Sequence, residues 1–277
     1  MSIVSSLAST PQKHATIEPR RQSTRLAALA IATCMTLVFA VLCLTSCSAT
    51  RNSVSVGVLT DVPGMSSMDP QTGSFSGYEI DVANEVFNRI YNGKADVMFV
   101  GVAGETREPD LNSNVVDALF ACYTVTDSRA ETYNLSTPYA HAKVTIMVQS
   151  DSNYTTVADM DGRTIGVLGD STSSPALTSY ATQCGVTVFP IGYETFLQAK
   201  DALDAGIIDG FSTDDIVLQG YMDESSRLLS DGFEEQAYAV ATNKDNSDLA
   251  QKIDAALADM REDGTLAALA ETWNITL

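Results

Sequence analysis

Residues 120–139 read FACYTVTDSRAETYNLSTPY, and this stretch joins a strand pattern to the start of a helix. Its first half alternates apolar and polar residues, so a strand here would place the Cys122 thiol and the Thr124 and Thr126 hydroxyls on one face. Thr126 then precedes a D-S-R sequence that ends in Arg129, which is typical of a capped helix start. Free backbone N–H groups beside an arginine predict a site for an anion such as a carboxylate. The alternative is a capped surface helix with its arginine in water.

Outward from this stretch, strand and helix signals alternate along the chain. We expect strands at residues 54–60, 95–100, 116–121, 143–149, 164–168, 186–190 and 238–242. We expect helices at residues 80–91, 175–184, 195–205 and 215–222, a short helix between residues 100 and 116, and two helical segments between residues 249 and 273, divided at Asp263-Gly264. Such alternation predicts an α/β fold of parallel sheets with helices on both faces.

The N-terminus has the pattern of an export signal. Basic residues precede an apolar run over residues 26–44, and the chain then turns polar after Cys47. Residues 44–47 (LTSC) resemble the lipobox of bacterial lipoproteins, which implies that residues 1–47 are a lipoprotein signal and that Cys47 is acylated. The protein would then be anchored by lipid to the outer face of the bacterial cytoplasmic membrane. A retained membrane-spanning helix is the alternative.

Charge and cysteine content exclude several classes of protein. The formal charge is −19, and without residues 1–47 there remain 34 acidic and 12 basic residues, a charge of −22. Nucleic acid is therefore not an expected partner, because its binding needs a basic surface. Only Cys122 and Cys184 follow the signal, so no disulfide framework is expected. The remaining length suffices for one large or two modest domains.

Two more strand ends carry polar residues. Residues 169–175 (GDSTSSP) follow an apolar strand and bring Ser171 and Thr172 to the start of a helix. Hydroxyls and free N–H groups at such a strand end form the usual ligand crevice of an α/β sheet, and an ordinary capped loop is the alternative. Residues 209–214 deliver Asp214 at another strand end, where it would pair with a cation or cap the next helix.

Arg107 is the sequence's most specific indication of a ligand side chain. If Arg107 and Arg129 both face one crevice, with Asp214 as its acid, the site complements two carboxylates and one ammonium. Aspartate and glutamate have that pattern of charges. The alternative is a surface arginine paired with Glu105 or Glu108, which would contribute little energetically.

From residue 54 to residue 273 the chain resembles the family 3 solute-binding proteins of amino-acid ABC importers, especially the branch that binds aspartate and glutamate. The motifs that carry the resemblance lie at residues 61–64 (DVPG), 77–83 (GYEIDVA), 107, 121–139, 166–172, 211–214 (FSTD), 218–221 (LQGY) and 263–265 (DGT). The resemblance implies a type II periplasmic-binding-protein fold, in which a two-strand hinge joins two doubly wound lobes. Lobe 1 would comprise residues 53–142 and 243–277, and lobe 2 residues 143–242.

The same resemblance implies a role for each candidate residue. Arg129 would hold the α-carboxylate of an amino acid, Asp214 its α-ammonium, and Arg107 a side-chain carboxylate. The remaining ligand-binding residues that it implies are Thr124 and Thr172 for the α-carboxylate, the backbone near Cys122 for the ammonium, and Ser171. The partners that it implies are the permease and ATPase subunits of an importer. For this protein we expect no cofactor, no metal and a monomeric state.

Three positions depart from the acidic-ligand branch, which often has lysine where this chain has Leu59, threonine at Cys122 and a small residue at Asp170. A lost cation and an added acid disfavour an acidic side chain, so asparagine, glutamine or cysteine stay open as ligands. A dehydratase on the same fold and a sensory module are alternatives of other classes. Because His141 is the only histidine after the signal, catalytic triads and histidine-rich metal sites have little support, and we expect a binding protein that is not an enzyme.

Overall fold

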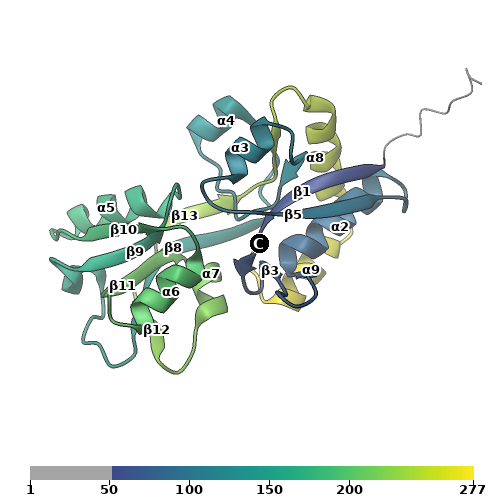
Figure 1. The fold of residues 1–277 in the computed structure, drawn as a ribbon. Coiled ribbons are helices and arrows are strands. Elements are labelled where there is room, and N and C mark those ends of the chain that lie inside the picture. The colour runs from purple at the N-terminus through teal and green to yellow at the C-terminus, as the bar shows by residue number, and fades with distance from the viewer. Residues whose placement is uncertain (1–51) are drawn as a thin grey trace, which may run out of the picture. The chain divides into compact units, whose positions relative to one another are not determined.

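The computed structural model describes residues 52–277, whose strands form two larger β-sheets and one small sheet (Figure 1). The export signal and Cys47 lie outside the described residues. None of the helices in residues 52–277 has the length and apolar character needed to cross a bilayer.

The first sheet has the strand order β5-β1-β6-β14-β7. Strand β1 pairs in parallel with β5 and β6, whereas β14 runs antiparallel to both of its neighbours. Helix α2 buries the apolar face that its sequence predicts, including Ile80, Val86 and Phe87, and the C-terminal helices α8 and α9 pack against it. The elements are β1 (Ser53–Leu59), α2 (Tyr78–Ile90), β5 (Asp96–Val102), α3 (Arg107–Asn112), β6 (Ala118–Leu119), α4 (Asp127–Thr132), β7 (Tyr133–Leu135), β14 (Ala241–Asn243), α8 (Ser247–Glu262) and α9 (Thr265–Trp273).

The second sheet has the order β10-β9-β11-β8-β12, and β13 also pairs with β8. Side chains alternate along β8, so Ile146 joins a core cluster with Leu177 of α5, whereas Met147 joins a cluster that includes Leu203 of α6. Helices therefore cover both faces of this sheet. The elements are β8 (Ala140–Gln149), η1 (Val157–Met160), β9 (Thr164–Leu168), α5 (Ser173–Gln183), β10 (Phe189–Tyr193), α6 (Phe196–Asp204), β11 (Gly210–Asp214), α7 (Asp215–Tyr221), β12 (Ser226–Leu228) and β13 (Phe233–Tyr238).

Two crossings of the chain connect the sheets. The first lies between β7 and β8, and the second lies between β13 and β14. The crossings are hydrogen-bonded to each other, because β8 and β13 pair in antiparallel register with Ala140 opposite Tyr238. This is the two-strand hinge of the expected fold. The lobe boundaries at residues 142/143 and 242/243 stay a prediction.

The structure differs from the sequence-based expectations in several places. The sheets are mixed and not purely parallel, because β14 and β8 run against their neighbours. The strand expected at residues 238–242 is divided between β13 and β14, since the Ala239 N–H donates to the Tyr123 carbonyl and the Val240 N–H to the Ser136 hydroxyl. A small antiparallel sheet of β2 (Asp61–Val62), β3 (Ser66–Met68) and β4 (Phe75–Ser76) was not foreseen.

Residues 121–126 also do not form the regular strand that their alternation suggests. Cys122 has a φ of 46°, in the left-handed region, which is incompatible with an extended strand. Within residues 121–126, the β-pairing is limited to an isolated β-bridge between Thr124 and Tyr238. The segment is instead an irregular turn beside the hinge.

Candidate functional site

The turn at residues 121–124 holds two buried arginines through its carbonyl groups. Nη1 of Arg107 donates to the Ala121 carbonyl at 3.0 Å, and Nη1 of Arg129 donates to the Thr124 carbonyl at 2.9 Å. Both guanidinium groups also lie over the Tyr123 ring, at 5.1 Å and 4.0 Å from its centroid. The structure therefore brings together the two arginines whose shared crevice was one of two alternatives from the sequence. Tyr123, whose ring lies under both guanidinium groups, was missed in the sequence analysis.

Arg107, in α3, is not a surface arginine. Only 3% of the residue is exposed, and among the ion pairs of residues 52–277 none joins it to Glu105 or Glu108. Its Nε is buried and has no hydrogen-bond partner in the described part of the chain. Burial lowers the pKa of the guanidinium and the nearby charge of Arg129 lowers it further, yet arginine remains protonated in proteins. Arg107 is thus a buried cation with an unused donor.

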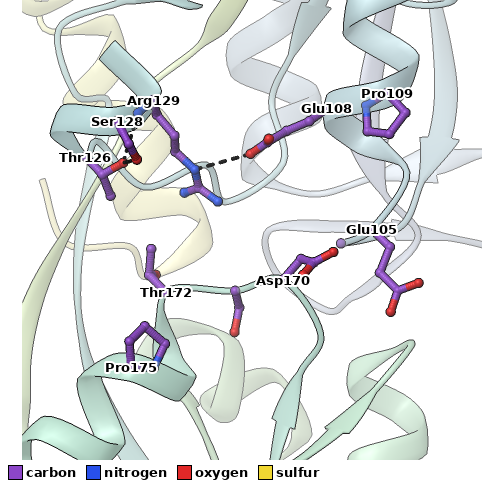
Figure 2. Close-up of a pocket in the computed structure, with 11 residues that line it drawn as sticks. Glu105, Glu108, Pro109, Thr126, Ser128, Arg129, Asp170, Thr172 and Pro175 are labelled. Atoms are coloured by element: carbon purple, nitrogen blue, oxygen red, sulfur yellow. Dashed lines mark hydrogen bonds and ion pairs between the residues drawn. The ribbon is translucent and has the colours of Figure 1, made fainter. Parts of the chain in front are cut away.

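Arg129, in α4, is held from three sides. Its N–H donates to the Thr126 hydroxyl at 3.2 Å, which confirms the predicted helix cap. Its Nε lies 3.5 Å from Oε1 of Glu108, and the Tyr123 hydroxyl donates to the same oxygen at 2.8 Å. Figure 2 shows Arg129 and Glu108 facing each other across the top of a pocket. Glu108 therefore orients Arg129, a role that its sequence position did not reveal.

Asp214, at the end of β11, occupies the N-cap position of α7, but its side chain makes no cap hydrogen bond. The Ile216 N–H is satisfied by Asp215 instead. Oδ2 of Asp214 accepts from the Tyr238 hydroxyl, whereas Oδ1 is buried without a partner among the described residues. Burial raises the pKa of Asp214 to about 6, although the Tyr238 hydrogen bond and the two arginines act to lower it. The helix-cap alternative for this side chain was wrong.

A pocket of about 700 Å³ opens beside Arg129 (Figure 2). Its volume lies in the usual range for a small-molecule site. The side chains of Arg129, Ser171 and Thr172 line it, and three carboxylates share the lining, from Glu105, Glu108 and Asp170. Of the other predicted residues, Thr124 adjoins the pocket, because its hydroxyl lies 3.5 Å from that of Thr172. Arg107, Cys122 and Asp214 do not line the pocket.

The hydroxyl groups at the start of α5 are directed by their neighbours. The Thr172 hydroxyl donates to Oε1 of Gln236 at 2.8 Å, and the Ser171 hydroxyl donates to the Leu168 carbonyl at 2.8 Å. Gln236 is nearly fully buried in β13. No local pattern in the sequence marks Gln236 as a neighbour of the site, because 64 residues separate it from Thr172.

Cys122 and Leu59 are both buried, so two of the three departures from the acidic-ligand branch lie inside the protein. Burial raises the pKa of the Cys122 thiol, and the carboxylates of Glu79 and Asp214 raise it further. The third departure, Asp170, has a φ of 53° and lines the pocket. Within residues 52–277, no group of three or more His, Cys, Asp or Glu side chains is arranged to hold a metal ion.

Known proteins resemble this chain over almost all of residues 52–277. Residues 54–276 match the bacterial extracellular solute-binding proteins, family 3. The ABC transporter glutamine-binding protein GlnH of Bacillus subtilis (strain 168) is 28% identical over 226 residues, which cover 80% of this chain and 81% of that protein. The glutamate-binding protein GluB of Corynebacterium glutamicum is 29% identical over 232 residues, which cover 79% and 77%.

A solved structure supports the fold. An ancestral arginine-binding protein bound to arginine has a TM-score of 0.72 and 28% identity, over 80% of this chain and 98% of that one. The two sheets, their helices and the paired crossings agree with a type II periplasmic-binding-protein fold. The chain belongs to the family 3 bacterial extracellular solute-binding proteins.

Proposed function

We propose that this protein is the extracytoplasmic substrate-binding subunit of an ABC importer and that it captures a polar amino acid. One observation carries the proposal: Oδ1 of Asp214 and Nε of Arg107 are buried and have no partner among the described residues. Buried polar atoms are almost always hydrogen-bonded, so an unpaired acceptor and an unpaired donor call for a molecule that supplies both. An amino acid supplies an ammonium for the first and a carboxylate for the second.

The α-carboxylate is assigned to Arg129, which lines the pocket and is already oriented by Glu108 and Tyr123. A ligand held by a few charge-assisted hydrogen bonds, each worth about 1.5–3 kcal/mol, reaches the roughly 8 kcal/mol of micromolar binding. Arg107 then meets a second carboxylate, so aspartate and glutamate are the first candidates. The glutamate-binding relative is consistent with this assignment.

A neutral ligand such as glutamine is the second candidate, and the pocket's own carboxylates favour it. Glu105, Glu108 and Asp170 line the pocket and would repel a carboxylate at the end of the ligand's side chain. A side-chain amide is uncharged and can donate hydrogen bonds to carboxylates. The glutamine-binding relative agrees with this candidate.

Isothermal titration of the purified protein would test both candidates. The protein is first unfolded and refolded to remove any amino acid that purifies with it, and it is then titrated with glutamate, aspartate, glutamine, asparagine, cysteine and arginine. A thermal-shift screen supports the result, because a ligand at 100 times its Kd adds about 2.7 kcal/mol of stability. If none of the common amino acids binds, the proposed function is wrong.

Simple binding without turnover is also part of the proposal. Steady-state assays with prephenate and arogenate are expected to show no product, since the residues gathered at the site are explained as binding groups. Dehydration of either compound at an enzymatic rate would favour the alternative of an enzyme on this fold.

The proposal extends to the location of the protein. The basic N-terminus, the apolar run and the LTSC sequence support attachment through an acylated Cys47 to the outer face of the cytoplasmic membrane. We propose that a monomer anchored in this way delivers its ligand to the permease and ATPase subunits of the importer.

A further inference from the structure

Glu79, in the first turn of α2, is a fully buried carboxylate that the proposed ligand contacts do not use. It accepts hydrogen bonds from the Cys122 N–H at 2.7 Å, from the Ser66 hydroxyl at 3.2 Å and from the Tyr139 hydroxyl. None of the ion pairs formed within residues 52–277 includes it. A buried carboxylate without a cation is costly, and the three hydrogen bonds offset part of that cost. The presence of a carboxylate at this position therefore calls for an explanation.

The bond to Cys122 reaches the one residue of the arginine-bearing turn that has an unusual backbone conformation. Cys122 has a φ of 46°, which residues other than glycine rarely adopt and which must be stabilised by the surrounding structure. Oε1 of Glu79 bonds to the N–H of this same residue. The carboxylate thus holds the turn at the point where it is strained.

Both arginines depend on this turn. The carbonyl of Ala121, just before Cys122, accepts from Arg107, and the carbonyl of Thr124, two residues after it, accepts from Arg129. A rotation of the backbone at Cys122 would turn these two carbonyls in different directions. The spacing between the two guanidinium groups, and hence their fit to a ligand, follows from the conformation that Glu79 holds.

We propose that Glu79 is a positioning residue for the amino-acid site, acting through the left-handed turn at Cys122 on Arg107 and Arg129. This inference rests on the proposed function and adds a residue that fixes the geometry of its site. Glu79 acts by the reach of its Oε1 atom and not by its charge.

Two conservative substitutions separate reach from charge. Glutamine at position 79 keeps the length of the side chain: its Oε1 accepts from Cys122 and Tyr139, and its amide donates to the Ser66 oxygen, which can accept when the hydroxyl rotates. Aspartate keeps the charge but is one methylene too short to reach the Cys122 N–H. We expect Glu79→Gln to bind the wild-type ligand with a Kd within about threefold of wild type, and Glu79→Asp to weaken binding at least tenfold.

A rescue experiment checks that the loss acts through Cys122. Glycine adopts a positive φ without strain, so adding Cys122→Gly to Glu79→Asp is expected to restore most of the lost affinity. Ser66→Ala serves as the matched control, because it removes a hydrogen bond from Glu79 without releasing Cys122. It is expected to lower the Tm while the Kd stays within about threefold.

The titrations use the amino acid that binds wild type most tightly, on variants whose circular dichroism matches wild type. Three results would each overturn the inference: equal losses of affinity for Glu79→Gln and Glu79→Asp, an unchanged Kd for Glu79→Asp, or no recovery of affinity when Cys122→Gly is added. In each case, amino-acid binding by the wild-type protein would still support the proposed function. A wild type that binds no amino acid would overturn both. Should Glu79→Asp fail to fold, Glu79→Gln alone still decides, since a tenfold loss there contradicts the argument from reach.

Discussion

Replacing Asp214 with asparagine should change stability and binding in opposite directions. Asp214 is 6% exposed and its Oδ1 has no partner within residues 52–277, so at neutral pH the protein without ligand buries a charge at a cost. Asparagine has nearly the same shape and can still accept from the Tyr238 hydroxyl. It removes the charge that destabilises the protein and that a ligand ammonium requires.

The pKa of Asp214 sets the size of the stability effect. Burial raises this pKa from 3.8 to about 6, which corresponds to about 3 kcal/mol. Because the pKa of the folded state is the higher one, the protonated carboxyl stabilises the fold fully below pH 3.8, and this contribution is lost as the pH rises through 6. Asp214→Asn should therefore be more stable than wild type by up to about 3 kcal/mol at pH 7, with the difference vanishing near pH 4.

The effect on binding has the opposite sign. A charge-assisted hydrogen bond contributes about 1.5–3 kcal/mol, so loss of the Asp214 charge should weaken amino-acid binding by roughly 10- to 150-fold. In wild type the affinity should also fall as the pH drops below about 6, by up to about tenfold per pH unit, because binding must then release the proton from Asp214. The asparagine variant has no such proton and should show a flat profile between about pH 5 and 7.

Chemical unfolding of the protein without ligand and isothermal titration, each at pH 5, 6 and 7, would measure both effects. Asp215→Asn is the matched control, because it removes one charge at the adjacent position and its oxygen can still accept from the Ile216 N–H. The control should keep a pH-dependent Kd, with its midpoint moved to lower pH, because the charge of Asp215 helps to raise the pKa of Asp214. An Asp214→Asn protein with wild-type Kd, or one less stable than wild type at pH 7, would show that Asp214 is a structural group and not the partner of an ammonium.

Arg129→Ala should abolish binding of every amino acid, whereas Arg107→Ala should weaken the binding of glutamate and aspartate by several kcal/mol and the binding of their amides by much less. Titration of both variants with the same panel of amino acids measures these losses. Equal losses across the panel for Arg107→Ala would exclude the acidic ligand. Cys47→Ser should release the protein from the membrane fraction, as shown by cell fractionation and mass of the processed chain, and unchanged attachment would indicate a retained helix. Gly220→Ala should destabilise the protein by about 1–3 kcal/mol in thermal unfolding, because a Cβ there would lie 2.4 Å from the Pro63 carbonyl oxygen, and a wild-type Tm would contradict this close approach.

The class of fold could be predicted from local patterns. The structure confirms the strand at residues 164–168, which follows from a local hydrophobic run. It also confirms the division of the C-terminal helices at residues 263–264, where Gly264 has the left-handed conformation. Both signals act over a few residues. The Thr126 cap was predicted for the same reason. Polar residues at the ends of predicted strands also predicted Arg129 and Asp214 as site residues.

Tertiary structure decided what those residues do. Whether Arg107 paired with a neighbouring glutamate or was buried with an unused donor depended on Ala121 and Tyr123, which pack against it from another part of the chain. At the break in the strand pattern, the Cys122 N–H donates to Glu79, 43 residues away.

The sequence by itself determined the alternation of the main strands and helices, the export signal pattern and the charges available to a ligand, because each of these is set by residues close together in the chain. Only the tertiary structure decided which of those charges are paired. Glu108 takes one side of Arg129, Tyr238 takes one oxygen of Asp214, and the other oxygen is left unpaired in the described part of the protein. The free energy of a buried charge depends on the partners that folding places around it, and those partners carry no local signal in the sequence.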